Sequence, residues 1–288
     1  MQFKRGFDVP SRFCLVRLID IRSSKRLGAE YGGTMKNQYF GDINDYRKYG
    51  LLRAIARCSG LRLLVAWMLT PDDGSTDGKF VSYLESPAKW ARYDPVLFEG
   101  LKALISSATQ REVRMIESSG LLGRAGYFPL IVPDVATERS RWFESLAEKA
   151  ELYDFVFLDP DNGVEIKSRL YGTKNSSKFL YWREVEALWT SGKSLLIYQH
   201  FIREKRVSFI QRMLDALKTE TPGSYVEAFS TPHVVFLMAL QPNHHSYHSE
   251  IVEAVQGQWA GQIQHWELIR AQKVAPADRS AAARLRVG

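Results

Sequence analysis

Apolar and polar residues follow two different rhythms between residues 35 and 270. In some segments apolar side chains recur every three or four residues, which is typical of one face of an α-helix. In others they form short unbroken runs, which are typical of a strand buried on both faces. The helix-like segments are residues 44–57, 97–105, 142–150, 182–189, 207–217 and 251–259. The strand-like segments are residues 61–69, 127–132, 153–158, 194–199, 225–229 and 233–240.

The alternation of these segments predicts an α/β fold. Strands that alternate with helices form a parallel sheet with helices on both faces, so we expect a Rossmann-like, doubly wound, mostly parallel sheet. The last two strand-like segments are separated only by a short stretch around Thr231-Pro232, which predicts a C-terminal antiparallel hairpin. The sequence therefore predicts a single domain over residues 35–270.

The two ends of the chain differ from the rest in charge. The whole chain of 288 residues is 45% hydrophobic and has a formal net charge of +7. Residues 1–34 carry seven Lys/Arg against three Asp/Glu, and residues 271–288 carry four against one, so residues 35–270 are formally neutral. We predict that residues 1–34 are a disordered or wrongly assigned extension and that residues 271–288 form a disordered basic tail. The net charge therefore does not by itself indicate a nucleic-acid-binding face.

Composition also predicts the cellular compartment of the protein. The chain has no apolar run of the roughly 18 residues that a transmembrane helix needs. Its two cysteines, Cys14 and Cys58, form no pattern typical of disulfides or metal ligands, which fits a reducing compartment. We therefore expect a soluble, cytoplasmic protein with no membrane partner.

One strand-like run stops abruptly at the polar segment Asp159-Pro160-Asp161-Asn162. Proline cannot donate a hydrogen bond to a strand ladder, so the strand should end there and present Asp159, Asp161 and Asn162 at its carboxyl end. In open α/β sheets, ligands bind at this edge. The alternative is an ordinary turn, because Pro, Asp and Asn all favour turns.

Two further strand-like segments lead polar side chains to the same predicted edge. Residues 61–69 are followed by Thr70-Pro71-Asp72-Asp73-Gly74, and residues 194–199 are followed by His200. An imidazole at such a position can serve as a base or bind a phosphate. The sequence thus predicts one site built from three strand ends.

The order of these parts resembles a known enzyme family. Residues 37–52 read NQYFGDINDYRKYGLL, an aromatic-rich opening that leads into the first helix, with Asn44 or Asp45 as its expected cap. The layout is similar to that of bacterial large-subunit ribosomal RNA adenine-N6 methyltransferases, which begin with such an opening. The strand and loop at residues 61–73 lie where that family has its cofactor loop, and residues 155–162 lie where it has its catalytic Asp-Pro-Pro-Tyr tetrad. The resemblance implies a class I methyltransferase fold, S-adenosylmethionine as cofactor and RNA or DNA as partner.

The resemblance and the polar strand ends together predict roles for single residues. In that family the tetrad's acid accepts a hydrogen bond from the target amine and its aromatic ring stacks on the base. The predicted catalytic residues are Asp159, Asp161, Asn162 and His200, and the predicted cofactor-binding residues are Asp42, Thr70, Asp72, Asp73 and Gly74. Two departures are visible: the glycine of the cofactor loop comes late, and Asn162 stands where the aromatic residue would be, so it can donate hydrogen bonds but cannot stack.

Two alternatives remain open. Asp159, Asp161 and Glu165 could hold Mg²⁺ in a phosphoesterase or nuclease, because clustered carboxylates are typical ligands of hard cations. The other alternative is a non-catalytic Rossmann module that binds a nucleotide or a partner. The imidazoles of His244, His245 and His248 have a spacing that could bind a transition metal, although they more simply open the last helix.

Overall fold

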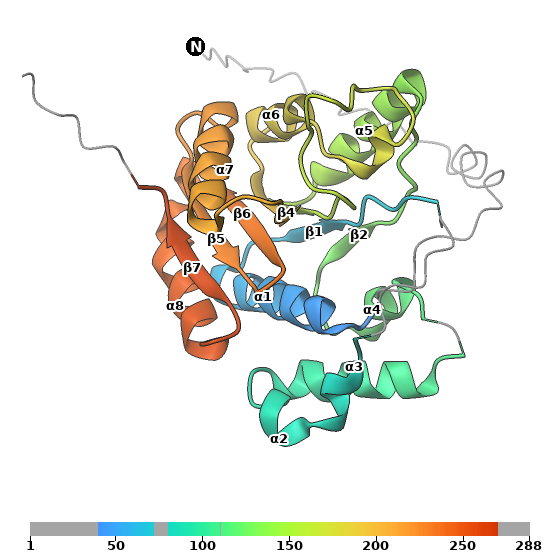
Figure 1. Cartoon of the computed structure of the whole chain (residues 1–288), viewed down its shortest axis with the longest axis vertical. Coiled ribbons are helices and arrows are strands. Elements are labelled where there is room, and N and C mark those ends of the chain that lie inside the picture. The colour runs from blue at the N-terminus through green and yellow to red at the C-terminus, as the bar shows by residue number, and fades with distance from the viewer. Residues whose placement is uncertain (1–39, 72–79, 110, 270–288) are drawn as a thin grey trace, which may run out of the picture. The chain divides into compact units, whose positions relative to one another are not determined.

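A seven-stranded sheet forms the centre of the part of the chain that the computed structural model describes, which is residues 40–71, 80–109 and 111–269 (Figure 1). The strands lie in the order β2-β1-β3-β4-β6-β5-β7. Their bounds are β1 Leu63–Ala66, β2 Gly126–Phe128, β3 Phe155–Leu158, β4 Ser194–His200, β5 Tyr225–Ser230, β6 Val234–Leu240 and β7 Gln264–Glu267. The predicted tails, residues 1–34 and 271–288, lie outside the described residues, so their predicted disorder and the domain bounds stay predictions.

The sheet is parallel at one end and antiparallel at the other. Strands β2, β1, β3 and β4 are parallel neighbours, and Val65 of β1 lies opposite Phe157 of β3. Strand β6 then pairs antiparallel with both β4 and β5, and β7 pairs antiparallel with β5. The backbone N–H of Thr231 donates to the carbonyl of Val234 at 2.8 Å, closing the turn between β5 and β6. The predicted C-terminal hairpin is therefore confirmed.

Helices cover both faces of this sheet (Figure 1). Their bounds are α1 Ile43–Ser59, α2 Pro87–Trp90, α3 Pro95–Ser107, α4 Arg114–Ser119, α5 Ala136–Ala150, α6 Trp182–Thr190, α7 Arg206–Glu220 and α8 His248–Gln258. Helices α1, α3, α4 and α8 contribute to one apolar core, and α5, α6 and α7 to the other. No helix among the residues described has both the length and the apolar character to cross a membrane. The expected α/β alternation is thus present, with a mixed sheet.

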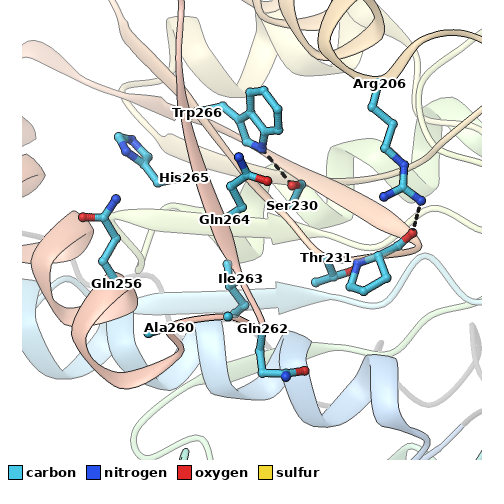
Figure 2. Close-up of a pocket in the computed structure, with 12 residues that line it drawn as sticks. Arg206, Ser230, Thr231, Gln256, Ala260, Gln262, Ile263, Gln264, His265 and Trp266 are labelled. Atoms are coloured by element: carbon cyan, nitrogen blue, oxygen red, sulfur yellow. Dashed lines mark hydrogen bonds between the residues drawn. The ribbon is translucent and has the colours of Figure 1, made fainter.

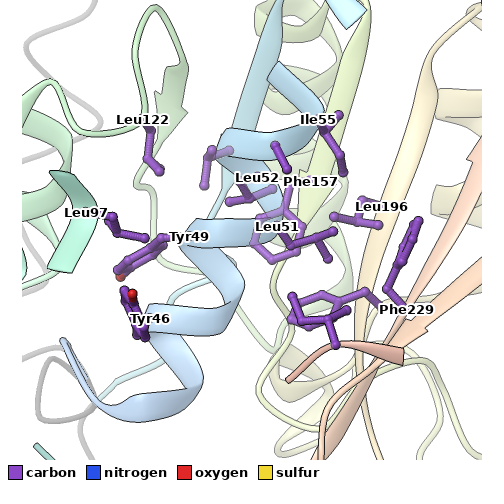
Figure 3. Close-up of a cluster of buried hydrophobic side chains, with 14 of the residues drawn as sticks. Tyr46, Tyr49, Leu51, Leu52, Ile55, Leu97, Leu122, Phe157, Leu196 and Phe229 are labelled. Atoms are coloured by element: carbon purple, nitrogen blue, oxygen red, sulfur yellow. The ribbon is translucent and has the colours of Figure 1, made fainter. Parts of the chain in front are cut away.

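Burial on both faces explains why the central strands are unbroken apolar runs. Along β3, Phe157 packs into the core under α1, whereas its neighbours Val156 and Leu158 pack into the core under α5, α6 and α7. Figure 3 shows the first core, where Tyr46 and Tyr49 of α1 lie toward Leu97 and Leu122. Helix α1 is therefore held firmly over the sheet.

Some details differ from the sequence prediction. The strand predicted at residues 61–69 is shorter, because Met68 adopts φ 48° and turns the chain out of the sheet after β1. Strand β7, α2 and α4 were not predicted, since each is short. The first helix is capped by Asp42 rather than by Asn44 or Asp45: its side chain accepts hydrogen bonds from the backbone N–H groups of both. That cap places the start of α1 at the site described next.

Candidate functional site

Three strand ends and the first turn of α1 enclose a cavity of about 740 Å³. The loops that follow β1, β3 and β4 supply most of its walls. Strand β1 has β2 on one side and β3 on the other, so the strand order reverses between β1 and β3. Ligands of open α/β sheets bind at such a switch point, outside the carboxyl ends of the strands. The cavity therefore lies where this architecture is expected to bind a ligand.

The loop after β3 is shaped by Gly163 and anchored by Gln199. Gly163 has φ +89°, and a Cβ at this position would collide with the side-chain amide of Gln199. That amide accepts a hydrogen bond from the backbone N–H of Val164 at 2.8 Å and donates one to the carbonyl of His200 at 2.9 Å. The side chain of Gln199 thus joins the loop after β3 to the end of β4, and it can come this close only because residue 163 is a glycine.

A second link joins the loops after β1 and β3. The hydroxyl of Thr70 donates a hydrogen bond to Oδ2 of Asp161 at 2.6 Å. The backbone N–H of Asp159 donates to the carbonyl of Ala66, the last residue of β1, at 3.1 Å. These bonds hold the predicted catalytic segment against the start of the predicted cofactor loop.

The first turn of α1 brings two more carboxylates to the cavity. Oδ1 of Asp42 accepts the backbone N–H groups of Asn44 and Asp45 at 2.8 and 2.9 Å, which satisfies donors that every helix start leaves open. Oδ2 of Asp45 accepts the backbone N–H of Gly41 and the hydroxyl of Tyr49, both at 2.9 Å. Several hydrogen bonds therefore orient the two carboxylates at the helix start.

Lys48 is the central cation of the site. Its Nζ lies 2.8 Å from Oδ1 of Asp45 and 2.8 Å from Oδ2 of Asp159, and the lysine side chain is only 11% exposed. The same ammonium lies 5.6 Å from the ring centroids of Tyr49, Trp67 and Tyr198. Lys48 thus bridges the helix start to the loop after β3 inside a cage of aromatic rings.

Burial changes the acidity of the groups around the cavity. Loss of water raises the pKa of Asp159 to about 6, even though Lys48 favours the charged carboxylate. Burial and the neighbouring Asp45 raise the pKa of Asp42 to about 6 as well. Burial opposes the charge of Lys48, but its two carboxylate partners outweigh burial and hold the lysine pKa above its ordinary value. Loss of water lowers the pKa of His200, so its imidazole is neutral at pH 7.

The lining combines negative charge with aromatic surface. Its carboxylates are Asp42, Asp45, Asp159 and Asp161, and its only Lys or Arg among the residues described is Lys48. Its aromatic side chains are Phe40, Tyr49, Trp67, Phe80, Phe179 and Tyr198. One buried acceptor in the lining, Oδ1 of Asn44, has no hydrogen-bond partner among the described residues. This environment favours a ligand that carries positive charge, hydrogen-bond donors and a flat apolar part.

Six of the nine predicted site residues line this one cavity. They are Asp42, Thr70, Asp159, Asp161, Asn162 and His200. The other three, Asp72, Asp73 and Gly74, lie outside the described residues. Lys48 was not predicted as a site residue, although its i,i+3 spacing from Asp45 on a helix was an available signal.

The alternative metal ligands are not brought together. Glu165 is not part of the cavity lining, and its Oε1 instead accepts the backbone N–H of Trp182 at 2.8 Å, at the start of α6. Across the described part of the chain, no group of three or more His, Cys, Asp or Glu side chains is arranged to hold a metal ion. Glu165 therefore stabilises a helix start, which corrects its predicted place in the acidic cluster.

The three histidines near the last helix also have separate partners. Nδ1 of His244 lies 2.8 Å from the hydroxyl of Ser194. His245 stacks on Tyr225, and Nε2 of His248 bonds to the carboxylate of Glu227. The rings of His245 and His248 stack on each other, but no group of three or more such side chains in the described part of the chain is arranged to hold a metal ion, so the predicted metal spacing is wrong here.

Several aromatic and basic side chains of α1 have partners inside the protein. Tyr46 and Tyr49 are fully buried in the core. Arg53 is buried against Asp94, with Nε 2.6 Å from Oδ2. Arg47 donates to Oε1 of Gln262 at 2.8 Å. Arg47 and Arg53 are therefore paired inside the protein, and a nucleic-acid partner stays a prediction.

A second cavity of about 700 Å³ lies beside β7 (Figure 2). It is lined by Arg206, the turn after β5, and polar side chains such as Gln256 and Gln264. Two hydrogen bonds cross its wall, from Nε1 of Trp266 to the hydroxyl of Ser230 at 2.8 Å and from Arg206 to the carbonyl of Pro232 (Figure 2). This cavity has no carboxylate among its lining residues, so it differs sharply from the first.

Neither the protein-family models nor the curated proteins with which the chain was compared show a match.

Proposed function

We propose that this protein is an S-adenosylmethionine-dependent methyltransferase that acts on an amine. The observation that carries the proposal is the acidic, aromatic-lined cavity at the switch point of the sheet. A mostly parallel sheet that ends in an antiparallel hairpin supports the finer fold class, a Rossmann-like domain of the class I methyltransferase kind. The cavity of about 740 Å³ has the volume of a site for a cofactor of this size.

The lining fits the chemistry of this cofactor. S-adenosylmethionine has a positively charged sulfonium, an ammonium group, a carboxylate and a flat adenine, so its net charge at neutral pH is positive. Carboxylates of Asp42 and Asp161 can balance the positive charge, and aromatic rings such as Trp67 suit both a cation and a flat ring. The unpaired acceptor Oδ1 of Asn44 can bind an N–H donor. When bound, the cofactor supplies an electrophilic methyl group, and its sulfur keeps the electron pair of the bond that breaks.

The remaining residues would bind and orient the acceptor. Oδ2 of Asp159 is held by Lys48, so the carboxylate has one fixed orientation, and its Oδ1 can accept a hydrogen bond from the target amine. Asn162 lines the same cavity and can add a hydrogen bond. His200 is neutral at pH 7 and can take the proton that the amine releases.

The Mg²⁺-dependent alternative has less support. A hard cation would be held by clustered carboxylates, but the ammonium of Lys48 already lies between Asp45 and Asp159. A phosphate in this cavity would face four carboxylates.

Calorimetric titration of the full chain with S-adenosylmethionine tests the proposal. The variant Asp42→Asn keeps the helix cap, because asparagine caps as well as aspartate, but removes one negative charge from the cavity. We expect the wild type to bind without added metal and Asp42→Asn to bind roughly 10-fold or more weakly, as expected for one lost charge contact at short range. Asp215→Asn, on the exposed face of α7, is the matched control and should bind like the wild type.

Absence of binding by the wild type would contradict the proposal. A heat signal with Mg²⁺ alone, lost in Asp161→Asn, would favour the phosphoesterase alternative instead.

A further inference from the structure

Exposed apolar side chains line the first cavity beside its carboxylates. Phe80, Ile166 and Ile202 all belong to the lining, and they are 68%, 50% and 56% exposed. They come from three separate loops, which follow β1, β3 and β4. A single exposed apolar side chain is ordinary, but several that gather at one polar opening are typical of an interaction surface. These three residues form the apolar rim of the cavity.

Basic residues neighbour the apolar rim along the chain. Lys167 follows Ile166, and Arg203 and Lys205 come shortly after Ile202. All three basic residues are exposed, and none of them forms an ion pair within the described part of the chain. Their positive charges are therefore available to an anionic ligand.

The acidic residues of the same two loops have other partners. Glu165 accepts the backbone N–H of Trp182 at the start of α6. Glu204 pairs with Arg212, with Oε2 2.7 Å from the guanidinium. Positive charge is therefore in excess where these loops surround the cavity.

The interior of the cavity has the opposite charge. Four carboxylates line it, against the single ammonium of Lys48 among the described residues. Burial raises the pKa of Asp42 and of Asp159 to about 6, so both carboxyl groups are mostly ionised at pH 7. The charge thus changes from negative inside the cavity to positive around its opening. An amine is favoured inside, and a phosphate is favoured at the opening.

One class of molecule carries an amine, a phosphate and an apolar part in this order. In an aminophospholipid, a short link joins the amine to the phosphate, and the phosphate is followed by acyl chains. The amine would enter the acidic cavity, the phosphate would meet the basic residues, and the apolar rim would reach the acyl layer. Exposed apolar side chains flanked by lysine and arginine are typical of proteins that bind at an anionic membrane surface.

A nucleic acid fits the apolar rim less well. Stacking on bases needs aromatic rings, whereas Ile166 and Ile202 are aliphatic. Binding at a membrane surface needs no helix that crosses the membrane, and none is found among the residues described. The sequence-based prediction of no membrane partner rested on the lack of such a helix, so it does not bear on surface binding.

We propose that the loops around the first cavity bind the surface of a phospholipid membrane, and that the amine acceptor is the headgroup of an aminophospholipid. This inference rests on the proposed function for the transfer itself, but binding to vesicles can be measured separately. In the transfer, the ammonium of the headgroup first gives one proton to His200. The nitrogen lone pair then bonds to the methyl carbon, and the sulfur keeps the electron pair of the bond that breaks.

Co-sedimentation of the full chain with vesicles tests the surface. The vesicles contain phosphatidylcholine with phosphatidylglycerol, an anionic lipid without an amine. Ile166→Ser/Ile202→Ser should bind them roughly 10-fold or more weakly, because two apolar side chains no longer enter the membrane. Lys167→Gln/Arg203→Gln/Lys205→Gln should lose about 5-fold for each charge, since one basic side chain near an anionic surface contributes about 1 kcal/mol.

Matched controls carry the same kinds of change elsewhere on the surface. Leu152→Ser is the apolar control, because Leu152 is 62% exposed but lines neither cavity. Lys89→Gln/Lys102→Gln/Lys149→Gln is the charge control, since these exposed lysines of α2, α3 and α5 also line neither cavity. Both controls should bind the vesicles like the wild type.

Phosphatidylethanolamine added to the same vesicles tests the cavity. The wild type should bind these vesicles more tightly, and Asp161→Asn should lose this gain while it binds the vesicles without the amine lipid like the wild type. Soluble glycerophosphoethanolamine, which has the headgroup without acyl chains, should not release the protein at the same headgroup concentration.

The inference is overturned if the wild type does not bind vesicles, if the variants of the rim and of the basic residues bind like their controls, or if phosphatidylethanolamine gives no gain. Release by the soluble headgroup would overturn the membrane as its source. Binding to a single-stranded oligonucleotide in place of vesicles would assign the surface to nucleic acid instead. Vesicle binding is measured without S-adenosylmethionine, whereas titration with that cofactor decides the proposed function, so each can fail without the other.

Discussion

The replacement Lys48→Met removes the one ammonium that balances Asp45 and Asp159. All three side chains are nearly buried, with 11%, 8% and 14% of their surfaces exposed. Methionine keeps the length and apolar stem of lysine, so packing against the aromatic rings should change little. Removing one partner of a buried ion pair leaves an unpaired charge and costs about 3–5 kcal/mol. We therefore expect a large loss of stability at neutral and alkaline pH.

The loss should depend on pH in a defined direction. In the wild type the pKa of Asp159 is about 6 in the folded state against 3.8 ordinarily, so stability falls as pH rises from about 4 to about 6 and then levels off. Without Lys48, nothing lowers the pKa of Asp159, which rises further. Stability then continues to fall above pH 6, by about 1.4 kcal/mol for each further pKa unit. The free energy of unfolding of Lys48→Met should thus differ least from that of the wild type at mildly acidic pH.

Urea unfolding followed by tryptophan fluorescence at about pH 5 and about pH 8 measures this difference. The double variant Lys48→Met/Asp159→Asn should recover part of the loss at the higher pH, because one unpaired carboxylate is gone. Lys89→Met, in the exposed helix α2, should stay within about 0.5 kcal/mol of the wild type at both pH values. Equal destabilisation of Lys48→Met at the two pH values, or none at all, would show that Lys48 does not stabilise the charged form of Asp159.

Two further predictions concern the packing of the fold. Gly50→Ala should destabilise the protein by about 2 kcal/mol or more, because its Cβ would overlap the ring of Trp259. Gly257→Ala, in α8, meets nothing within 4 Å and should stabilise the protein by about 0.5–1 kcal/mol. Thermal unfolding compares the two variants, and equal effects would contradict the contact between Gly50 and Trp259. Arg139→Met should cost about 3–5 kcal/mol in urea unfolding, since it leaves the buried carboxylate of Glu184 unpaired, and a change below 1 kcal/mol would show that the pair is dispensable.

Local sequence signals explain why much of the site could be predicted. Asp159 and His200 follow apolar runs that suit only buried strands, and the carboxyl ends of parallel strands meet at one edge. Thr70 could be placed beside them for the same reason, and its bond to Asp161 is observed.

What could not be predicted depends on contacts between distant segments. The role of Lys48 follows from the placement of α1 over the sheet edge, which brings it to Asp159, 111 residues away. Strand β7 has no apolar run, and it joins the sheet partly because Nε2 of His265 bonds to the buried Glu227 at 2.6 Å. Neither contact has a local sequence signal, since each depends on how distant segments pack.

The location of the cofactor site is the central claim, and hydrogen exchange followed by mass spectrometry tests it most directly. The full chain would be compared with and without S-adenosylmethionine at saturating concentration. We expect slower exchange around the first cavity, in residues 40–49, 67–71, 159–166 and 198–202, and unchanged exchange in residues 256–266 beside the second cavity. Protection confined to residues 256–266, or no protection in the described part of the chain, would contradict it.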